Sequence, residues 1–151
     1  MQDPQCQREN RLDGRSTEAA SFVITDIARF LEPLNEALFS DFLELASNLY
    51  STGYKDAAVV ICGSVLEGHL RKLCKGLGIA VIAENGLPKK ADVLNGELAV
   101  KGAYSKLDEK NVTAWLDLRN HAVCGEYDRY ARDEVAPLLE GVRSLLDRHP
   151  A

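Results

Sequence analysis

The chain has 151 residues, of which 46% are hydrophobic and 27% are charged, so it is long and apolar enough to form one globular domain. Its formal net charge of -5 argues against a broad nucleic-acid-binding face, although a small cleft for one or two phosphates stays compatible with it. No apolar run approaches the roughly 20 residues that span a bilayer, and the first residues lack the apolar core of a signal peptide, so we expect a cytoplasmic protein without membrane contact.

The chain begins with polar residues, and after them apolar residues recur at helical spacing. Residues 1–15 show no periodicity, and we expect a disordered arm there, followed by a single helical domain over residues 16–150. Apolar residues at three- and four-residue steps predict a first helix that ends at Pro33 and a second helix over about 34–49. A third helix over about 54–75 is apolar nearly all round in its first half, which predicts that it occupies the centre of the bundle.

The second half of this central helix carries the charged residues Glu67, Arg71 and Lys72, which predicts a change to an amphipathic helix. Gly63 and Gly68 also lie within it, and each costs helix stability of roughly 1 kcal/mol relative to alanine. Two explanations stay open, the close approach of a neighbouring helix and a cleft that holds a ligand.

The remainder of the chain reads as further helices joined by short connections. Residues 79–90 form a connection with a turn at Asn85-Gly86, and no β-hairpin signal appears. We expect one helix over about 91–100 and a second that begins at a cap, Ser105 or Asp108, and ends at Gly125. A terminal helix follows, with an apolar stripe from Val135 to Leu146 and with Pro137 in or near its first turn. The sum is an all-α antiparallel helical bundle of about five to six helices.

The four cysteines give no metal or disulfide framework. Cys6, Cys62, Cys74 and Cys124 form no CxxC pair, and the three histidines do not have metal-ligand spacing. We read Cys62 and Cys74 as small apolar core residues. The sequence therefore predicts reduced thiols, no metal and no cofactor.

One stretch, residues 116–127, departs from simple packing. Val112 and Leu116 belong to an apolar helical stripe whose next step reaches Arg119, so Arg119 falls on a face that should be buried. A guanidinium cannot lose its charge, so an arginine at this position needs an acidic partner or a water-filled cleft. We therefore place the candidate site in this stretch.

The order Arg119-Asn120-x-x-x-Cys124-Gly125, late in a helix and before a terminal amphipathic helix, resembles the motif of the HEPN superfamily. Residues 57–73 are similar to the central helix of small bacterial HEPN-like proteins, and the resemblance covers roughly residues 40–147. It implies a HEPN-like helical bundle. In nuclease members, arginine, a following asparagine or aspartate, and a later histidine form a metal-independent RNase site, commonly across a homodimer. Many other members are inactive structural, nucleotide-binding or regulatory domains.

The chain departs from that motif at one position. Cys124 stands where the RNxxxH pattern has its histidine, and His121 lies three residues earlier. RNA cleavage needs a proton carrier near the 2′-hydroxyl, which imidazole supplies near neutral pH and a thiol with an ordinary pKa of about 8.5 supplies poorly. Either cleavage has been lost, which we favour, or His121 acts from its shifted position.

Each candidate residue has a structural interpretation beside the functional one. Arg119 would bind a phosphate, or it would pair with Glu67 on the central helix, and the two roles are compatible. Asn120 would either orient a phosphate or face solvent. His121 would either act as a general base or be an ordinary residue near a helix end. Cys124 is more simply a packed small residue than a nucleophile. Tyr104, Tyr127 and Tyr130 flank the motif helix and would stack on bases or form the rim of the bundle.

The resemblance leads to two main functional hypotheses. The first is a catalytically degenerate RNA- or nucleotide-binding regulatory domain, within a toxin–antitoxin or phage-defence system. The second is a metal-independent endoribonuclease that uses Arg119, Asn120 and His121, so whether the chain is an enzyme stays open. A third hypothesis is a structural dimerisation domain. The expected partners are a second copy, which pairs through the motif helix, RNA or a nucleotide, and an antitoxin-type protein.

Overall fold

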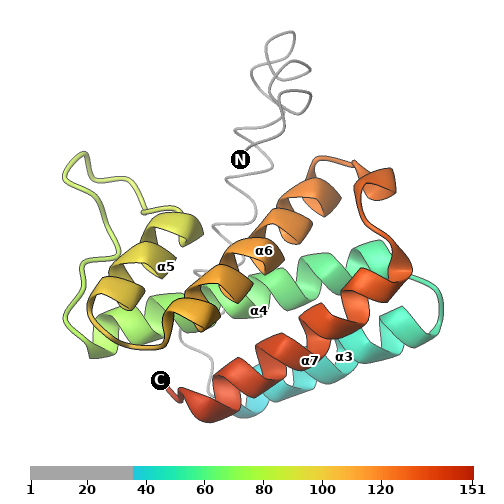
Figure 1. Cartoon of the computed structure of the whole chain (residues 1–151), viewed down its shortest axis with the longest axis horizontal. Helices are drawn as coiled ribbons and strands as arrows, with labels where there is room; N and C mark the ends of the chain where they lie inside the picture. The colour runs from blue at the N-terminus through green and yellow to red at the C-terminus, as the bar shows by residue number, and fades with distance from the viewer. Residues whose placement is uncertain (1–35) are drawn as a thin grey trace, which may run out of the picture.

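The computed structural model describes residues 36–151, so the expected arm and first helix lie outside the described residues. Within this part of the chain there are five α-helices, one short 3-10 helix and no strand. These elements are α3 (Glu36–Ser51), α4 (Lys55–Gly76), α5 (Ala91–Val100), α6 (Lys106–Val123), η1 (Tyr127–Arg129) and α7 (Arg132–Arg148) (Figure 1). The expectation of an all-α helical bundle is confirmed for the described residues.

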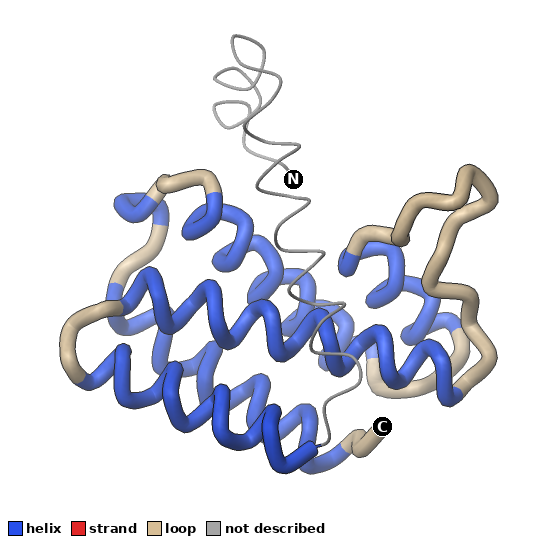
Figure 2. The backbone as a smooth tube through the Cα atoms, turned by 180° about the vertical axis from the view of Figure 1, so that it is seen from behind, coloured by secondary structure: helices blue, strands red, loops and turns tan. Residues whose placement is uncertain are grey.

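The longest helix, α4, is the centre of the bundle and packs against all four other α-helices. Helices α3 and α7 lie together on one side of it, and α5 and α6 lie together on the other (Figures 1 and 2). Ala58, Val59, Cys62, Val65 and Leu66 of α4 have no exposed surface. The nearly all-round apolar sequence of this helix follows from its position, because it meets protein on every side.

The predicted helix ends agree with the structure, with one difference at α7. The Ser105 hydroxyl accepts a hydrogen bond from the Asp108 backbone N–H at 3.1 Å and caps α6. In α7 the Glu134 carboxylate accepts from the Ala131 backbone N–H at 2.6 Å, which fixes the start of the helix at Arg132. Pro137 therefore lies in the second turn, one turn deeper than its first-turn preference predicts.

The connection between α4 and α5 is more ordered than the sequence indicates. Ile82 and Pro88 form an isolated antiparallel bridge, and the Ala83 N–H donates to the Leu87 carbonyl at 2.8 Å. Gly86 has φ +79°, as the predicted Asn-Gly turn requires. Residues 77–90 thus make a small arm that extends beyond the helices beside α5 (Figure 2).

Helices α6 and α7 are joined at two points. Trp115 of α6 packs on Gly141 of α7 so closely that a Cβ at position 141 would lie 2.1 Å from the indole Cζ2. Where α6 begins and α7 ends, an Arg148 guanidinium N–H donates to the buried Asp108 carboxylate at 2.8 Å. These contacts fix the direction of α6 and hence the position of its carboxyl end, where the candidate motif lies.

Candidate functional site

Arg119 lies in the last turns of α6 and is 8% exposed, as the apolar stripe of that helix predicts. Its Nη1 forms a buried ion pair with the Oε2 of Glu67 on α4. The stem of Arg119 crosses α4 at Gly63, where a Cβ would lie 2.5 Å from the Arg119 Cγ. Of the two explanations for Gly63, the close approach of a neighbouring helix is therefore the one that the structure supports.

Arg71, one turn after Glu67 on α4, completes the same cluster. Its Nη2 donates to Glu67 Oε1 at 2.9 Å and to the Lys89 carbonyl at 2.8 Å. Glu67 and Arg71 are 3% and 1% exposed, so Glu67 takes the pairing with Arg119 that the sequence allowed, whereas the expectation of an amphipathic half of α4 is wrong for Arg71. We call Glu67, Arg71 and Arg119 the Glu67 cluster.

The Glu67 cluster contains two guanidinium groups and one carboxylate, which leaves one positive charge in excess. Burying a charge is costly unless it is paired and hydrogen-bonded, and here one carboxylate divides its two oxygens between both arginines. The Nε atoms of Arg71 and Arg119 are buried without a hydrogen-bond partner in the described part of the protein. The cluster therefore has unused donors and unbalanced charge, both of which suit an anion.

The residues after Arg119 connect the Glu67 cluster to the surface. Arg119 Nη2 donates to the Asn120 side-chain oxygen at 3.2 Å, and Asn120 is exposed. The His121 ring is 28% exposed, and its Nδ1 lies 2.6 Å from Glu126 Oε2. Sequence reasoning missed Glu126, although its position just past the Gly125 helix stop indicated that the chain turns back toward His121.

Cys124 is the C-cap residue of α6 and directly follows the helix that carries the other motif residues. Its sulfur is disulfide-bonded, so the expectation of a reduced thiol is wrong for Cys124. Residue spacing cannot show such a pairing, because the two halves of a disulfide need only be close in space. In this state Cys124 supplies neither a proton carrier nor a nucleophile.

The remaining cysteines in this part of the chain, Cys62 and Cys74, have free thiols inside the bundle, as predicted. Burial raises the pKa of Cys62 to about 12 and is the largest cause of the rise of the Cys74 pKa to about 11. Both thiols are therefore protonated at neutral pH and unreactive.

Two of the three tyrosines near the motif are core anchors. Tyr104 donates its hydroxyl to the Asn95 side chain at 2.5 Å, and Tyr130 donates to Asp56, so both rings are buried at the ends of helices. Of these three tyrosines, Tyr127 alone is exposed, at 49%. The base-stacking role is thus open to Tyr127 and closed to Tyr104 and Tyr130.

The structure joins Arg119 to Glu67 and to Asn120 at the carboxyl end of α6, whereas His121, two positions after Arg119 on the helix, contacts Glu126. No three His, Cys, Asp or Glu side chains within residues 36–151 are grouped so that they could hold a metal ion. The groups present can hold an anion through guanidinium and amide N–H groups, and His121 can exchange a proton.

Comparison of the chain with protein-family models, with curated proteins and with solved structures finds no match in any of the three. None of the helices between residues 36 and 151 combines the length and apolar character that crossing a bilayer requires.

Proposed function

We propose that the domain is a HEPN-like regulatory module that binds a phosphate group of RNA or of a nucleotide at the carboxyl end of α6 and does not cleave it. The observation that carries this proposal is the excess positive charge of the Glu67 cluster, in which two guanidiniums share one carboxylate. Arg119 links the cluster to the surface, because it donates a hydrogen bond to the exposed Asn120 side chain.

The alternative for Arg119 is a purely structural ion pair, and its closed contact with Glu67 favours that role. The two roles coexist in the proposal, since Nη1 serves Glu67 while Nη2 contacts the exposed Asn120. The dipole of α6 opposes an anion at this end by roughly 0.3–1 kcal/mol. A whole excess charge in a partly buried position outweighs that cost.

The expected footprint is small because the chain is acidic overall and the cluster offers one excess charge. For single-stranded nucleic acid the logarithm of the binding constant falls with the logarithm of the salt concentration by about 0.7 per neutralised phosphate. We therefore expect a salt slope of roughly -0.7 to -1.4, which corresponds to one or two phosphates.

The binding test uses fluorescence anisotropy of a labelled single-stranded RNA, and competition by ADP, in EDTA at low salt. Arg119→Met removes the excess charge and leaves Glu67 paired with Arg71, so binding should fall at least tenfold with the fold retained. Lys110→Ala removes the same charge from an exposed position near the other end of α6 and should change binding little. Equal losses in both variants, or no binding at low salt, would leave the structural dimerisation domain as the better hypothesis.

A second candidate function is a metal-independent endoribonuclease, and the contact between His121 and Glu126 favours it. A carboxylate 2.6 Å from Nδ1 fixes the orientation of the imidazole, as the acidic member of a catalytic triad does. In this function Arg119 stabilises the phosphate in the transition state, Asn120 orients it, and His121 accepts the proton of the 2′-hydroxyl.

Cleavage of labelled RNA in EDTA tests the second function. Activity that disappears in both Arg119→Met and His121→Ala would establish it and overturn the proposal of binding without cleavage. Cys124→His restores the family's histidine, and Cys124→Ser is its control because both variants remove the disulfide. Activity gained only by Cys124→His would show that an inactive site lacks its proton carrier alone.

The biological setting belongs to the same proposal. A phosphate-binding domain without catalysis suits a regulatory role in a toxin–antitoxin or phage-defence system, with an antitoxin-type protein as partner and with a homodimer as the working unit. Co-purification of the full chain with its neighbouring gene products tests this setting. Recovery of the full chain alone, with no bound nucleotide or protein, would count against it.

A further inference from the structure

Exposed apolar side chains are concentrated on α5 and the adjoining arm, which we together call the α5 surface (residues 77–101). Five of the nine large hydrophobic side chains that are exposed in the described part of the chain belong to it. They are Leu77 (46%), Ile82 (40%), Leu87 (62%), Val93 (46%) and Val100 (89%). A contiguous apolar patch, unlike scattered side chains, marks a surface that another molecule covers, and Val93 and Val100 lie in one patch with Ile79.

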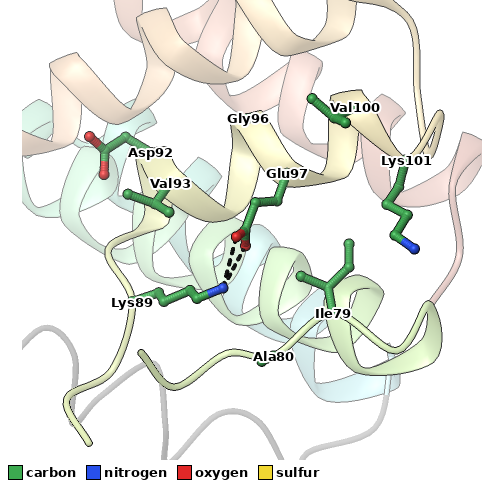
Figure 3. Close-up of a pocket in the computed structure, with 9 residues that line it drawn as sticks. All are labelled: Ile79, Ala80, Lys89, Asp92, Val93, Gly96, Glu97, Val100 and Lys101. Atoms are coloured by element: carbon green, nitrogen blue, oxygen red, sulfur yellow. Dashed lines mark hydrogen bonds and ion pairs between the residues drawn. The ribbon is translucent and has the colours of Figure 1, made fainter. Parts of the chain in front are cut away.

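The α5 surface also contains an open groove of about 490 Å³ between α5 and the arm (Figure 3). Its apolar lining includes Ile79, Val93 and Val100, and the Lys89 ammonium bridges to Glu97 across it at 2.8 Å. Gly96 leaves the middle of α5 bare, because a Cβ there would have no neighbour within 4 Å. Another helix can therefore approach the backbone of α5 closely.

Charge indicates what kind of molecule can cover this surface. Residues 77–101 contain three acidic and three basic side chains and are formally neutral, whereas the whole chain has a net charge of -5. Two copies of an acidic protein repel one another over most of their surfaces, and a neutral apolar region is where that repulsion is least. A strongly basic or acidic partner would find no complementary field here.

We propose that the α5 surface pairs with the same surface of a second copy of this chain. Val93 and Val100 are both exposed and lie two turns apart on one face of α5, on either side of the midpoint between Gly96 and Glu97. A twofold axis through that midpoint therefore packs Val93 against the partner's Val100 in an antiparallel helix pair. This inference is independent of the phosphate site, which lies at the carboxyl end of α6.

The motif helix is a poorer surface for the same purpose. Val112, Leu116 and Ala122 of α6 are buried within one copy, and Trp115 packs on Gly141 of α7. The outward residues of α6 are mostly polar or small, namely Lys106, Lys110, Thr113, Ala114 and Asn120, with Leu107 as the large apolar exception. We therefore place the contact between copies on α5 and not on the motif helix that the family resemblance implies.

Sedimentation velocity of the full chain over about 1 to 200 µM, the range in which weak homodimers dissociate, tests the inference. Val93→Lys and Val100→Lys should each raise the dimer dissociation constant at least tenfold. Leu45→Lys is the matched control, because Leu45 on α3 is 45% exposed, as Val93 is 46% exposed, and the same charge is introduced. Leu45→Lys should leave the dimer unchanged.

Salt separates this inference from the proposed function. A neutral apolar contact should persist in 0.5 M NaCl, whereas phosphate binding should weaken, and Val100→Lys should still bind RNA at low salt. A chain that stays monomeric throughout, or a dimer that survives both valine variants, would overturn the α5 pairing. Equal loss in Leu45→Lys would also overturn it, because added charge and not the α5 surface would then explain the effect.

Discussion

At the residue scale, the Glu67 cluster shows how one carboxylate serves two helices. Glu67 accepts from Arg71 on its own helix and from Arg119 on α6, and all three side chains are nearly excluded from solvent. Removal of one member of a buried ion pair is strongly destabilising when it leaves the other charge uncompensated. In a cluster of two cations and one anion, the cost therefore depends on which member is removed.

Glu67→Gln should be the most destabilising change in the cluster. It leaves two buried guanidiniums without a counter-charge, and we expect a loss of about 3–5 kcal/mol in the free energy of unfolding. Arg119→Met keeps the Glu67–Arg71 pair and the apolar stem, so it should cost less than about 1.5 kcal/mol. Urea denaturation measures both, and a reversed order would contradict the shared-carboxylate description.

Gly63→Ala tests the close passage of Arg119 over α4. Alanine favours helix by roughly 1 kcal/mol, but its Cβ would lie 2.5 Å from Arg119 Cγ, so α4 and α6 must separate. We expect a net loss of about 1–3 kcal/mol in the urea unfolding free energy. Gly76→Ala, in the last turn of the same helix with no neighbour within 4 Å, should be neutral or slightly stabilising. A stabilised Gly63→Ala would show that the two helices can adjust freely.

At the scale of elements, helical periodicity and glycine or proline positions predicted five helices of the described chain to within a few residues. These signals are local, so they hold without knowledge of the packing. The burial of Arg71 could not be predicted in this way, because its partner Glu67 is also held by Arg119, 52 residues further along the chain. The i,i+4 spacing of Glu67 and Arg71 was the available signal, but such pairs usually face solvent.

Helices α6 and α7 are also linked by a titrating contact. The hydrogen bond from Arg148, together with the Ser105 cap, lowers the pKa of the Asp108 carboxyl from 3.8 to about 2. A lowered pKa stabilises the fold above the unfolded value, and this contribution is lost as pH falls from about 4 toward 2. Because Arg148 is half exposed and screened by solvent, we expect a loss of no more than about 2 kcal/mol.

Urea unfolding at pH 5, 4, 3 and 2 checks this dependence on Asp108. Asp108→Asn keeps the shape of the side chain and removes the titration, so its stability should fall less steeply over this range than that of the unmodified protein. Parallel curves for the two proteins would assign the acid sensitivity to other carboxylates.

At the scale of the whole molecule, the bundle is built around α4, whose thiols lie where no reagent reaches them. The raised pKa values of Cys62 and Cys74 keep both thiols protonated at pH 8. We therefore expect negligible alkylation by iodoacetamide in the native protein and full reaction at both positions through the urea transition. Mass spectrometry of the labelled peptides measures this, and fast native labelling of Cys62 would contradict the packing around α4.

The shared carboxylate also limits the order in which mutations can alter this protein. A lineage that replaces Glu67 first must tolerate two buried guanidiniums without a counter-charge. A lineage that first loses Arg71 or Arg119 retains one buried carboxylate paired with one guanidinium. The tolerated mutational route to a fully apolar interior therefore starts at an arginine, and it ends at the glutamate because a buried carboxyl can become neutral by protonation whereas a guanidinium cannot.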